Sequence, residues 1–324
     1  MLPLPDFELL RPATLDDALG LLAQDGAMPL AGGTDLLPRL RRGLHQPHRV
    51  VDLGALRGFD GIEARDGRWH LGAGVTLATL ANHAALARAL PALVQAAGEV
   101  AGPGHRSAAT LGGNLCQDTR CVFYNQSAWW RAANGHCLKR EGSVCHVAPQ
   151  GQHCHAAYAG DLAPALLAYG AEVEVLGVPG PRRVPLQDLY RDDGAAHLVL
   201  GPGELVTAVH LPQPSPGSAS AYRKVRARAA MDFPLAGVAV RLRREQGVLV
   251  ELAIGISGTN SYPLRLEGSE TLLGRPVDEA LLKALGKLVQ KQVSPMRSTV
   301  TAANHRRLVA ATLAQRLVRE LAAA

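Results

Sequence analysis

The chain has 324 residues, of which 47% are hydrophobic and 19% are charged, a composition typical of folded globular proteins rather than disordered or fibrous ones. The net charge of +6 comes from basic residues dispersed along the chain, and aromatic residues make up only 4%, so we expect no nucleic-acid partner. No apolar run is long enough to span a bilayer, and the N-terminus shows no basic leader. We therefore expect a cytoplasmic protein without a membrane partner.

The N-terminal part of the chain alternates helix and strand signals. Thr14 is expected to cap a helix whose first turn carries two aspartates, which suit the positive end of a helix. Residues 27–31 and residues 48–53 predict two short buried strands, and residues 67–72 predict another. Thr76 is a second candidate helix cap. This order of elements indicates an α/β unit.

The rest of the chain divides near a segment rich in proline and serine. Before it, an apolar stripe that ends at glycine predicts one helix over residues 85–102. Residues 211–222 form the breaking segment, and beyond it two strand patterns meet at Gln246–Gly247, followed by two helical patterns. We expect a first domain at residues 1–218 and a C-terminal α+β domain at residues 219–324.

Two glycine turns carry the strongest functional signal. "PLAGGTDLL" occupies residues 29–37 and "AATLGGNLCQD" occupies residues 108–118. Successive small residues let backbone N–H groups converge on an anion, and a threonine adds a hydroxyl. Each turn alone is also compatible with an ordinary strand-to-helix connection. Two such turns together favour a large cofactor that carries phosphate groups.

These motifs resemble a known family. "PLAGGTDLLPRLRRG" and "TLGGNLCQD" resemble the FAD-binding medium subunit of the molybdenum hydroxylases, the xanthine dehydrogenase family, and the resemblance continues through residues 160–175, 203–212 and 222–240. It implies a vanillyl-alcohol-oxidase-like FAD-binding fold, with two α/β lobes that meet near residue 55 and a C-terminal α+β domain. It also implies a molybdenum-cofactor large subunit and a [2Fe–2S] small subunit as partners, in a dimer of heterotrimers.

The resemblance further implies which residues contact FAD. The first turn would hold the pyrophosphate, the second would lie near the flavin ring and ribityl chain, and three residues farther along would complete the site. No residue of this chain is expected to act on an organic substrate. The implied flavin contacts are Pro29, Leu30, Ala31, Gly32, Gly33, Thr34, Asp35, Leu36, Ala109, Thr110, Gly113, Asn114, Asp161, Leu205 and Lys224.

All five cysteines lie between residues 116 and 154. Cys116 belongs to the second glycine motif, where a small hydrophobic role suits it. The other four, Cys121, Cys137, Cys145 and Cys154, lie in residues 119–160, an insertion that ordinary members of the family lack. Four thiolates are the number that an iron–sulfur cluster needs. The insertion resembles that of one branch, the flavin subunit of 4-hydroxybenzoyl-CoA reductase, which implies a [4Fe–4S] cluster.

Two other interpretations of the cysteines stay open. A structural zinc site would also use four ligands, with or without His136, His146, His153 or His155, although zinc ribbons favour closely paired cysteines. Disulfides are less expected, because a reducing cytoplasm disfavours them.

The resemblance to the reductase branch also implies a direction of electron flow. A ferredoxin-like donor would supply low-potential electrons through the cluster and FAD toward molybdenum, where 4-hydroxybenzoyl-CoA is reduced to benzoyl-CoA. One alternative is an aerobic-type hydroxylase subunit that passes electrons outward and carries a structural metal loop. Another is a nucleotide-binding module without redox chemistry.

Overall fold

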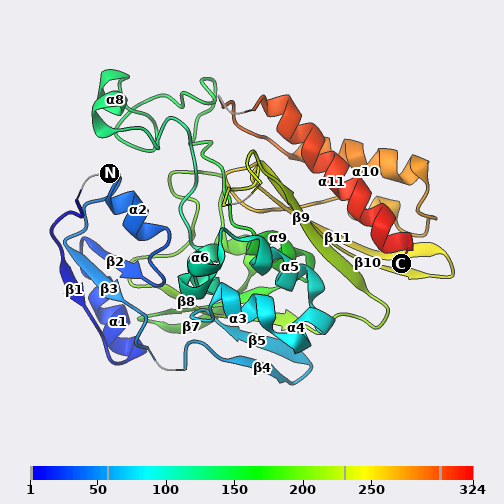
Figure 1. Ribbon diagram of the computed structural model, residues 1–324, viewed down its shortest axis with the longest axis horizontal. Coiled ribbons are helices and arrows are strands. Elements are labelled where there is room, and N and C mark those ends of the chain that lie inside the picture. Colours follow the sequence, from blue (N-terminus) through cyan, green and yellow to red (C-terminus); the bar gives the residue numbers. More distant parts are fainter. Residues whose placement is uncertain (1–2, 57, 230, 299–300, 324) are drawn as a thin grey trace.

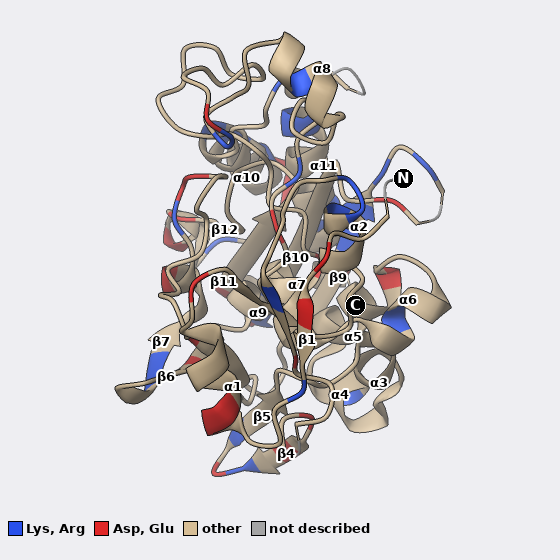
Figure 2. Cartoon of the chain, turned by 90° about the vertical axis from the view of Figure 1, so that its left-hand side faces the viewer, with Lys and Arg blue, Asp and Glu red and all other residues tan. Residues whose placement is uncertain are grey.

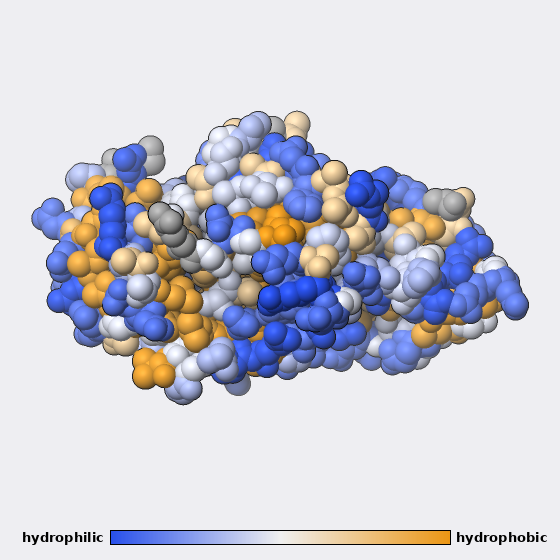
Figure 3. Space-filling view, turned by 90° about the horizontal axis from the view of Figure 1, so that it is seen from below, coloured by the Kyte–Doolittle hydropathy of each residue, from blue (hydrophilic) through white to orange (hydrophobic). Residues whose placement is uncertain are grey.

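The computed structural model describes residues 3–56, 58–229, 231–298 and 301–323. It contains three β-sheets, and helices pack around and between them (Figure 1). In the described residues, no helix is both long enough and apolar enough to cross a membrane. Figure 2 shows basic and acidic positions interspersed along the chain. On the face seen in Figure 3, hydrophobic patches are likewise separated by hydrophilic residues.

The first lobe is a small parallel sheet with two helices. Its strands are arranged in the order β1-β3-β2, and both pairings are parallel. The side chain of Thr14 accepts a hydrogen bond from Asp17 N at 3.1 Å, so the predicted cap of the first helix is confirmed. The elements are β1 (Glu8–Leu10), α1 (Leu15–Leu22), β2 (Ala27–Leu30), α2 (Leu36–Leu40) and β3 (Arg49–Asp52).

The second lobe is built on an antiparallel sheet in the order β4-β5-β8-β6-β7. Its strands are β4 (Ile62–Arg65), β5 (Arg68–Gly72), β6 (Glu172–Gly177), β7 (Gly180–Pro185) and β8 (Leu205–Pro212). Its helices are α3 (Leu77–Asn82), α4 (Ala84–Ala89), α5 (Pro91–Glu99), α6 (Pro103–Ala108), α7 (Leu111–Leu115), α9 (Leu162–Ala168) and the 3-10 turn η1 (Leu186–Leu189).

One helix prediction in this lobe is wrong. Residues 85–102 form two helices, α4 and α5, instead of one. The break falls at Leu90, whose backbone is not helical (φ −132°, ψ 56°) because a following proline disfavours the helical conformation. Pro91 then begins α5, at a position where its missing N–H costs nothing. The predicted cap at Thr76 is confirmed, since its side chain accepts from Thr79 N at 3.1 Å.

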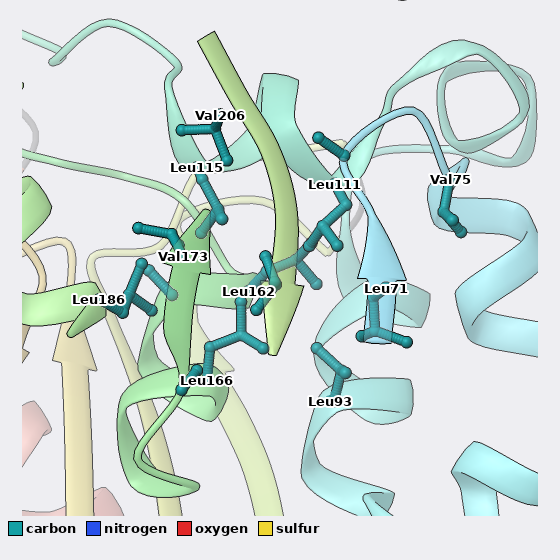
Figure 4. Close-up of a cluster of buried hydrophobic side chains, with 14 of the residues drawn as sticks. Leu71, Val75, Leu93, Leu111, Leu115, Leu162, Leu166, Val173, Leu186 and Val206 are labelled. Atoms are coloured by element: carbon teal, nitrogen blue, oxygen red, sulfur yellow. The ribbon is translucent and has the colours of Figure 1, made fainter. Parts of the chain in front are cut away.

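The core of the second lobe brings together the segments that position both glycine turns. Figure 4 shows Leu111 and Leu115 of α7 directed into the same cluster as Leu162 of α9 and Val173 of β6. These four side chains are fully buried, and burial of each contributes roughly 1.5–3 kcal/mol. Every residue of α9 is buried, because the helix also packs on the sheet of the C-terminal domain. Helix α7 is therefore held rigidly.

The C-terminal domain is an antiparallel sheet, β12-β11-β10-β9, on which α11 packs, and α10 packs against α11. Gln246 and Gly247 both have positive φ values, 48° and 85°, as a tight hairpin turn requires, so the predicted turn is confirmed. The elements are β9 (Ala219–Val225), β10 (Ala236–Glu245), β11 (Val248–Ser257), β12 (Leu264–Arg265), the 3-10 turn η2 (Ser269–Leu272), α10 (Glu279–Gln292) and α11 (Ala303–Ala323).

The cysteine insertion, residues 119–160, forms a compact lobe of loops with one short helix, α8 (Ala128–Ala133), at the top of the view in Figure 1. It has its own small apolar core, which also contains Leu44 from the first lobe and Met296 from the C-terminal domain. Arg297 N donates a hydrogen bond to Val147 O at 3.2 Å. The insertion is therefore packed against both neighbouring regions.

Candidate functional site

The first glycine turn leaves β2 and leads into α2. Gly33 has φ +71°, a left-handed conformation that side chains other than glycine rarely adopt. Gly32 lies directly against the segment before the second turn. A Cβ atom at this position would be 1.8 Å from the carbonyl oxygen of Ala108. The two glycine turns, far apart in the sequence, therefore touch through their backbones.

The second glycine turn forms the short helix α7. Thr110 caps it, and its hydroxyl accepts a hydrogen bond from Gly113 N at 3.1 Å. Asn114 is buried and accepts from Leu162 N at 3.2 Å, which ties the turn to the start of α9. Hydrogen bonds within the protein therefore hold this turn in place without a ligand.

Together the two turns line a cavity of about 660 Å³. This volume lies within the usual range for sites of small molecules and cofactors, roughly 300–1,000 Å³. Twelve of the fifteen predicted flavin contacts line the cavity: Pro29, Ala31, Gly32, Gly33, Thr34, Asp35, Leu36, Ala109, Thr110, Gly113, Asn114 and Leu205.

The other three predicted contacts, Leu30, Asp161 and Lys224, lie outside the cavity lining. Leu30 packs instead with the small apolar cluster of the first lobe. Lys224 Nζ lies 3.0 Å from Asp161 Oδ1, and Tyr222 donates to the same oxygen at 2.5 Å. Burial raises the pKa of Asp161 against the lowering effect of Lys224. Direct flavin contact by these three residues stays a prediction.

Several lining residues are absent from the predicted set. Arg39, Arg42, Arg120 and Arg228 bring positive charge to the cavity, which suits a ligand with a pyrophosphate. Arg39 stands four residues after Asp35, a helical spacing that the sequence already displays.

Arg228 has no comparable signal in the sequence. It reaches the cavity from the C-terminal domain, through the loop between β9 and β10 that also supplies Met231 and Phe233.

An ion-pair network in the wall of the cavity joins the two turns. Arg39 lies 3.4 Å from Asp35 Oδ2 and 3.0 Å from Asp118 Oδ2, so one guanidinium bridges both motifs. Arg120 also pairs with Asp35 and lies over the ring of Phe233, 4.4 Å from its centroid. Burial alone would raise the pKa of Asp118, but neighbouring cations, Arg39 among them, lower it below its usual value. Asp118 is therefore ionised at neutral pH.

The four cysteines of the insertion gather around a second, much smaller cavity of about 10 Å³. All four thiols are free and buried. Phe123, Tyr124 and Val147 line the same cavity and shield it from water. His146 lines the cavity as well. Its ring stacks on Phe123 at 3.9 Å between ring centroids, and its Nε2 lies 2.6 Å from the carbonyl oxygen of His136.

The donor set fits an iron–sulfur cluster in ligand type and number. Within the described ranges, no three Cys, His, Asp or Glu side chains are arranged to hold a single metal ion. A cluster places its own iron and sulfide atoms between its ligands, so its thiolates stand farther apart than those of one ion. Because the cavity is small, the thiols must move outward to admit one. Burial raises the pKa of Cys121, and that of Cys154 to about 12, so metal binding must displace protons.

Cys116 lies apart from these four thiols, in the lining of the larger cavity. Burial raises the pKa of its thiol to about 12, so it is a neutral, apolar wall residue at physiological pH.

Two glycine turns that enclose a cavity with cationic walls define a binding protein for a phosphate-bearing cofactor. Comparison with known proteins gives the family. The protein-family model described as FAD binding domain in molybdopterin dehydrogenase matches residues 5–214. The family model described as CO dehydrogenase flavoprotein C-terminal domain matches residues 220–321.

Individual relatives agree with the family models. The chain is 30% identical to the xanthine dehydrogenase FAD-binding subunit of Escherichia coli O157:H7, with 97% of this chain and 95% of that protein covered. It is 34% identical to the aldehyde oxidoreductase FAD-binding subunit PaoB of Escherichia coli K12, with 80% and 82% covered. A chain of reconstituted CO dehydrogenase from Oligotropha carboxidovorans superposes with a TM-score of 0.83 at 27% identity, with 99% of both chains covered.

The chain belongs to the FAD-binding medium subunits of the molybdenum hydroxylase family. The protein is therefore an FAD-binding subunit of an oxidoreductase. The larger cavity, which both glycine turns line, is its candidate FAD site.

Proposed function

We propose that this FAD subunit also carries a [4Fe–4S] cluster on Cys121, Cys137, Cys145 and Cys154. One observation supports this most strongly. Four thiols, spread over 34 positions of the chain from residue 121 to residue 154, are buried side by side around one cavity and form no disulfide. Free cysteines also pack in apolar cores as small hydrophobic residues, but four of them around one cavity match the ligand number of an iron–sulfur cluster. Their apolar surroundings suit a cluster that is protected from water.

FAD exchanges one or two electrons and a cluster passes one at a time, so together they convert between the two kinds of transfer. The residues of this chain bind and orient these groups. The glycine turns present backbone N–H groups to the pyrophosphate, and the arginines balance its charge. Phe123 and Tyr124 exclude water from the thiols. We assign the FAD-binding part of the chain to the vanillyl-alcohol-oxidase-like fold that its family resemblance implies.

For the particular reaction, we propose the reductive dehydroxylation of 4-hydroxybenzoyl-CoA to benzoyl-CoA. The cysteine insertion supports this, because it resembles that of the reductase branch. In this role a low-potential ferredoxin-like donor feeds the subunit, and electrons leave it toward a [2Fe–2S] small subunit and a molybdenum-cofactor large subunit. The assembly is proposed to be a dimer of heterotrimers in the cytoplasm.

A second candidate is oxidation with electrons flowing outward. It is favoured by the names of relatives, which include xanthine dehydrogenase, aldehyde oxidoreductase and carbon monoxide dehydrogenase subunits. In that case molybdenum oxidises an aldehyde or a heteroaromatic ring, and this subunit delivers electrons to an external acceptor.

The two candidates are separated by assaying the assembled enzyme in both directions. One assay supplies reduced viologen or ferredoxin and follows formation of benzoyl-CoA from 4-hydroxybenzoyl-CoA. The other supplies an aromatic aldehyde or xanthine and follows reduction of a dye. Cys121→Ser is the matched variant, and it is expected to retain FAD because Cys121 does not line the larger cavity. The first proposal predicts that the wild-type enzyme reduces the aryl-CoA and that this activity is lost in Cys121→Ser. If the enzyme reduces the dye with aldehyde or xanthine and does not reduce the aryl-CoA, the second candidate is correct.

A further inference from the structure

Lys139 is the buried cation that connects the cysteine insertion to the rest of the protein. Its side chain is only 4% exposed, although lysine is rarely buried unless it is paired. The ammonium group has three protons and finds three oxygen acceptors, namely Asp118 Oδ1 at 2.7 Å, Thr119 Oγ1 at 2.5 Å and Gly194 O at 2.9 Å. Every donor of the group is therefore satisfied.

On one side, Lys139 belongs to the cysteine cavity. Its side chain lines that cavity together with the four thiols. Its ammonium group lies 4.8 Å from the ring centroid of Tyr124, another lining residue. The carbonyl of Gly194, which accepts from Lys139, belongs to a residue whose N–H donates to Cys154 O at 2.7 Å. The ammonium group is thus held in the same framework as one of the thiols.

On the other side, Lys139 reaches the FAD site through Asp118. The backbone N–H of Asp118 donates to Asp35 Oδ2 at 3.1 Å, and Arg39 binds both carboxylates. Asp35, Arg39 and Gln117, the residue before Asp118, all line the FAD cavity. A continuous chain of polar contacts therefore runs from Lys139, in the lining of the cysteine cavity, to the first and second glycine turns.

We propose that Lys139 is the positioning residue that fixes the cysteine cavity relative to the FAD site and couples the two sites energetically. The effect of Lys139 on an iron–sulfur cluster rests on the proposed function. The effect of Lys139 on FAD affinity rests only on the contacts of its side chain. Because Lys139 does not line the FAD cavity, an effect of its removal on FAD affinity is indirect. Its ion pair with Asp118 is the contact that leads toward that cavity. Lys139 also lines the cysteine cavity, where its positive charge would favour the reduced, more negative form of a bound cluster.

The test compares Lys139→Met with Lys283→Met, the same substitution at an exposed position of α10. FAD is titrated into the deflavinated full-length chain, and the midpoint potential of the iron–sulfur signal is followed by electron paramagnetic resonance. Lys139→Met is expected to raise the Kd for FAD about tenfold, within the range usual for coupled sites, and to lower the midpoint potential. Lys139→Arg retains the charge and is expected to restore the potential. Lys283→Met is expected to change neither quantity.

Asp118→Asn removes the same contact from its other end, so its Kd for FAD decides the test if Lys139→Met does not fold. If both single variants fold, the double variant combines the two substitutions. Since both residues act through one contact, the double variant is expected to bind FAD no more weakly than the weaker single variant. Additive losses, or unchanged FAD affinity in Lys139→Met, would overturn the inference. The iron content of the wild-type chain reports separately on the proposed function. If the wild-type chain contains no iron but Lys139→Met still binds FAD more weakly, the proposed cluster is wrong. The role of Lys139 in FAD binding would then be retained.

Discussion

Substitution of Gly32 by alanine tests whether direct contact between the two glycine turns creates the FAD site. The added Cβ would lie 1.8 Å from Ala108 O, 2.4 Å from Ala108 C and 2.9 Å from Ala109 N. These are backbone atoms, so no side chain can rotate away. Real Cβ contacts essentially never fall below 3.0 Å, and the carbonyl oxygen must therefore withdraw by about 1.2 Å from the first turn.

A displacement of this size is enough to break hydrogen bonds between one turn and the pyrophosphate. A hydrogen bond to a charged group contributes about 1.5–3 kcal/mol, and each 1.4 kcal/mol corresponds to about a tenfold change in affinity. Loss of one such bond is therefore expected to weaken FAD binding roughly 10- to 100-fold. Gly32 itself needs no left-handed conformation, so the effect isolates the contact between the turns.

The assay is titration of FAD into the deflavinated chain, followed by quenching of flavin fluorescence. Gly67→Ala is the control, because Gly67 has φ +69° but open space around its Cβ position in the turn between β4 and β5. That variant pays only the conformational cost, about 1–2 kcal/mol of stability, and should bind FAD normally. A Kd for Gly32→Ala within twofold of wild type would refute the idea that the closely packed turns form the site.

Three further predictions concern the cysteines, a buried histidine and a buried ion pair. Cys121→Ser is expected to lose most of the iron and sulfide of the chain, whereas Cys116→Ser should keep both; the reverse result would mean that the ligand set is wrong. Burial lowers the pKa of His197 to about 4, below the unfolded value near 6.5, so the free energy of unfolding in urea should fall as pH decreases from 6.5 toward 4. His197→Gln should reduce this pH dependence, and an unchanged dependence in the variant would contradict the prediction. Asp161→Asn leaves Lys224 buried without its carboxylate and is expected to cost about 3–5 kcal/mol in urea unfolding; a loss below 1 kcal/mol would show that the pair contributes little.

The glycine turns and the local caps were predictable because their signals are local. Thr14, Thr76 and the Gln246–Gly247 turn act on backbone groups within three residues, so the sequence contains all that decides them. The break at Leu90 was also visible in principle, since proline restricts the residue before it. An apolar stripe that continued across Pro91 concealed that signal.

The parts of the site that escaped prediction depend on contacts between distant segments. Arg228 and Phe233 line the FAD cavity only because the C-terminal domain packs beside it. Asp161 and Lys224 are chemically suited to a cofactor, but in the fold they form an ion pair with each other. Lys139 lies only two residues after Cys137, yet its contact with Asp118 arises from the path of the whole insertion. Such pairings follow from packing and have no periodic signature.

We propose that four cysteines of this FAD subunit bind one [4Fe–4S] cluster. An anaerobic analysis of the purified wild-type chain for iron, acid-labile sulfide, zinc and flavin tests this proposal most directly. We expect four iron and four sulfide per chain beside one FAD, with broad brown absorption over the flavin bands. One zinc per chain without sulfide, or FAD with no metal at all, would contradict it.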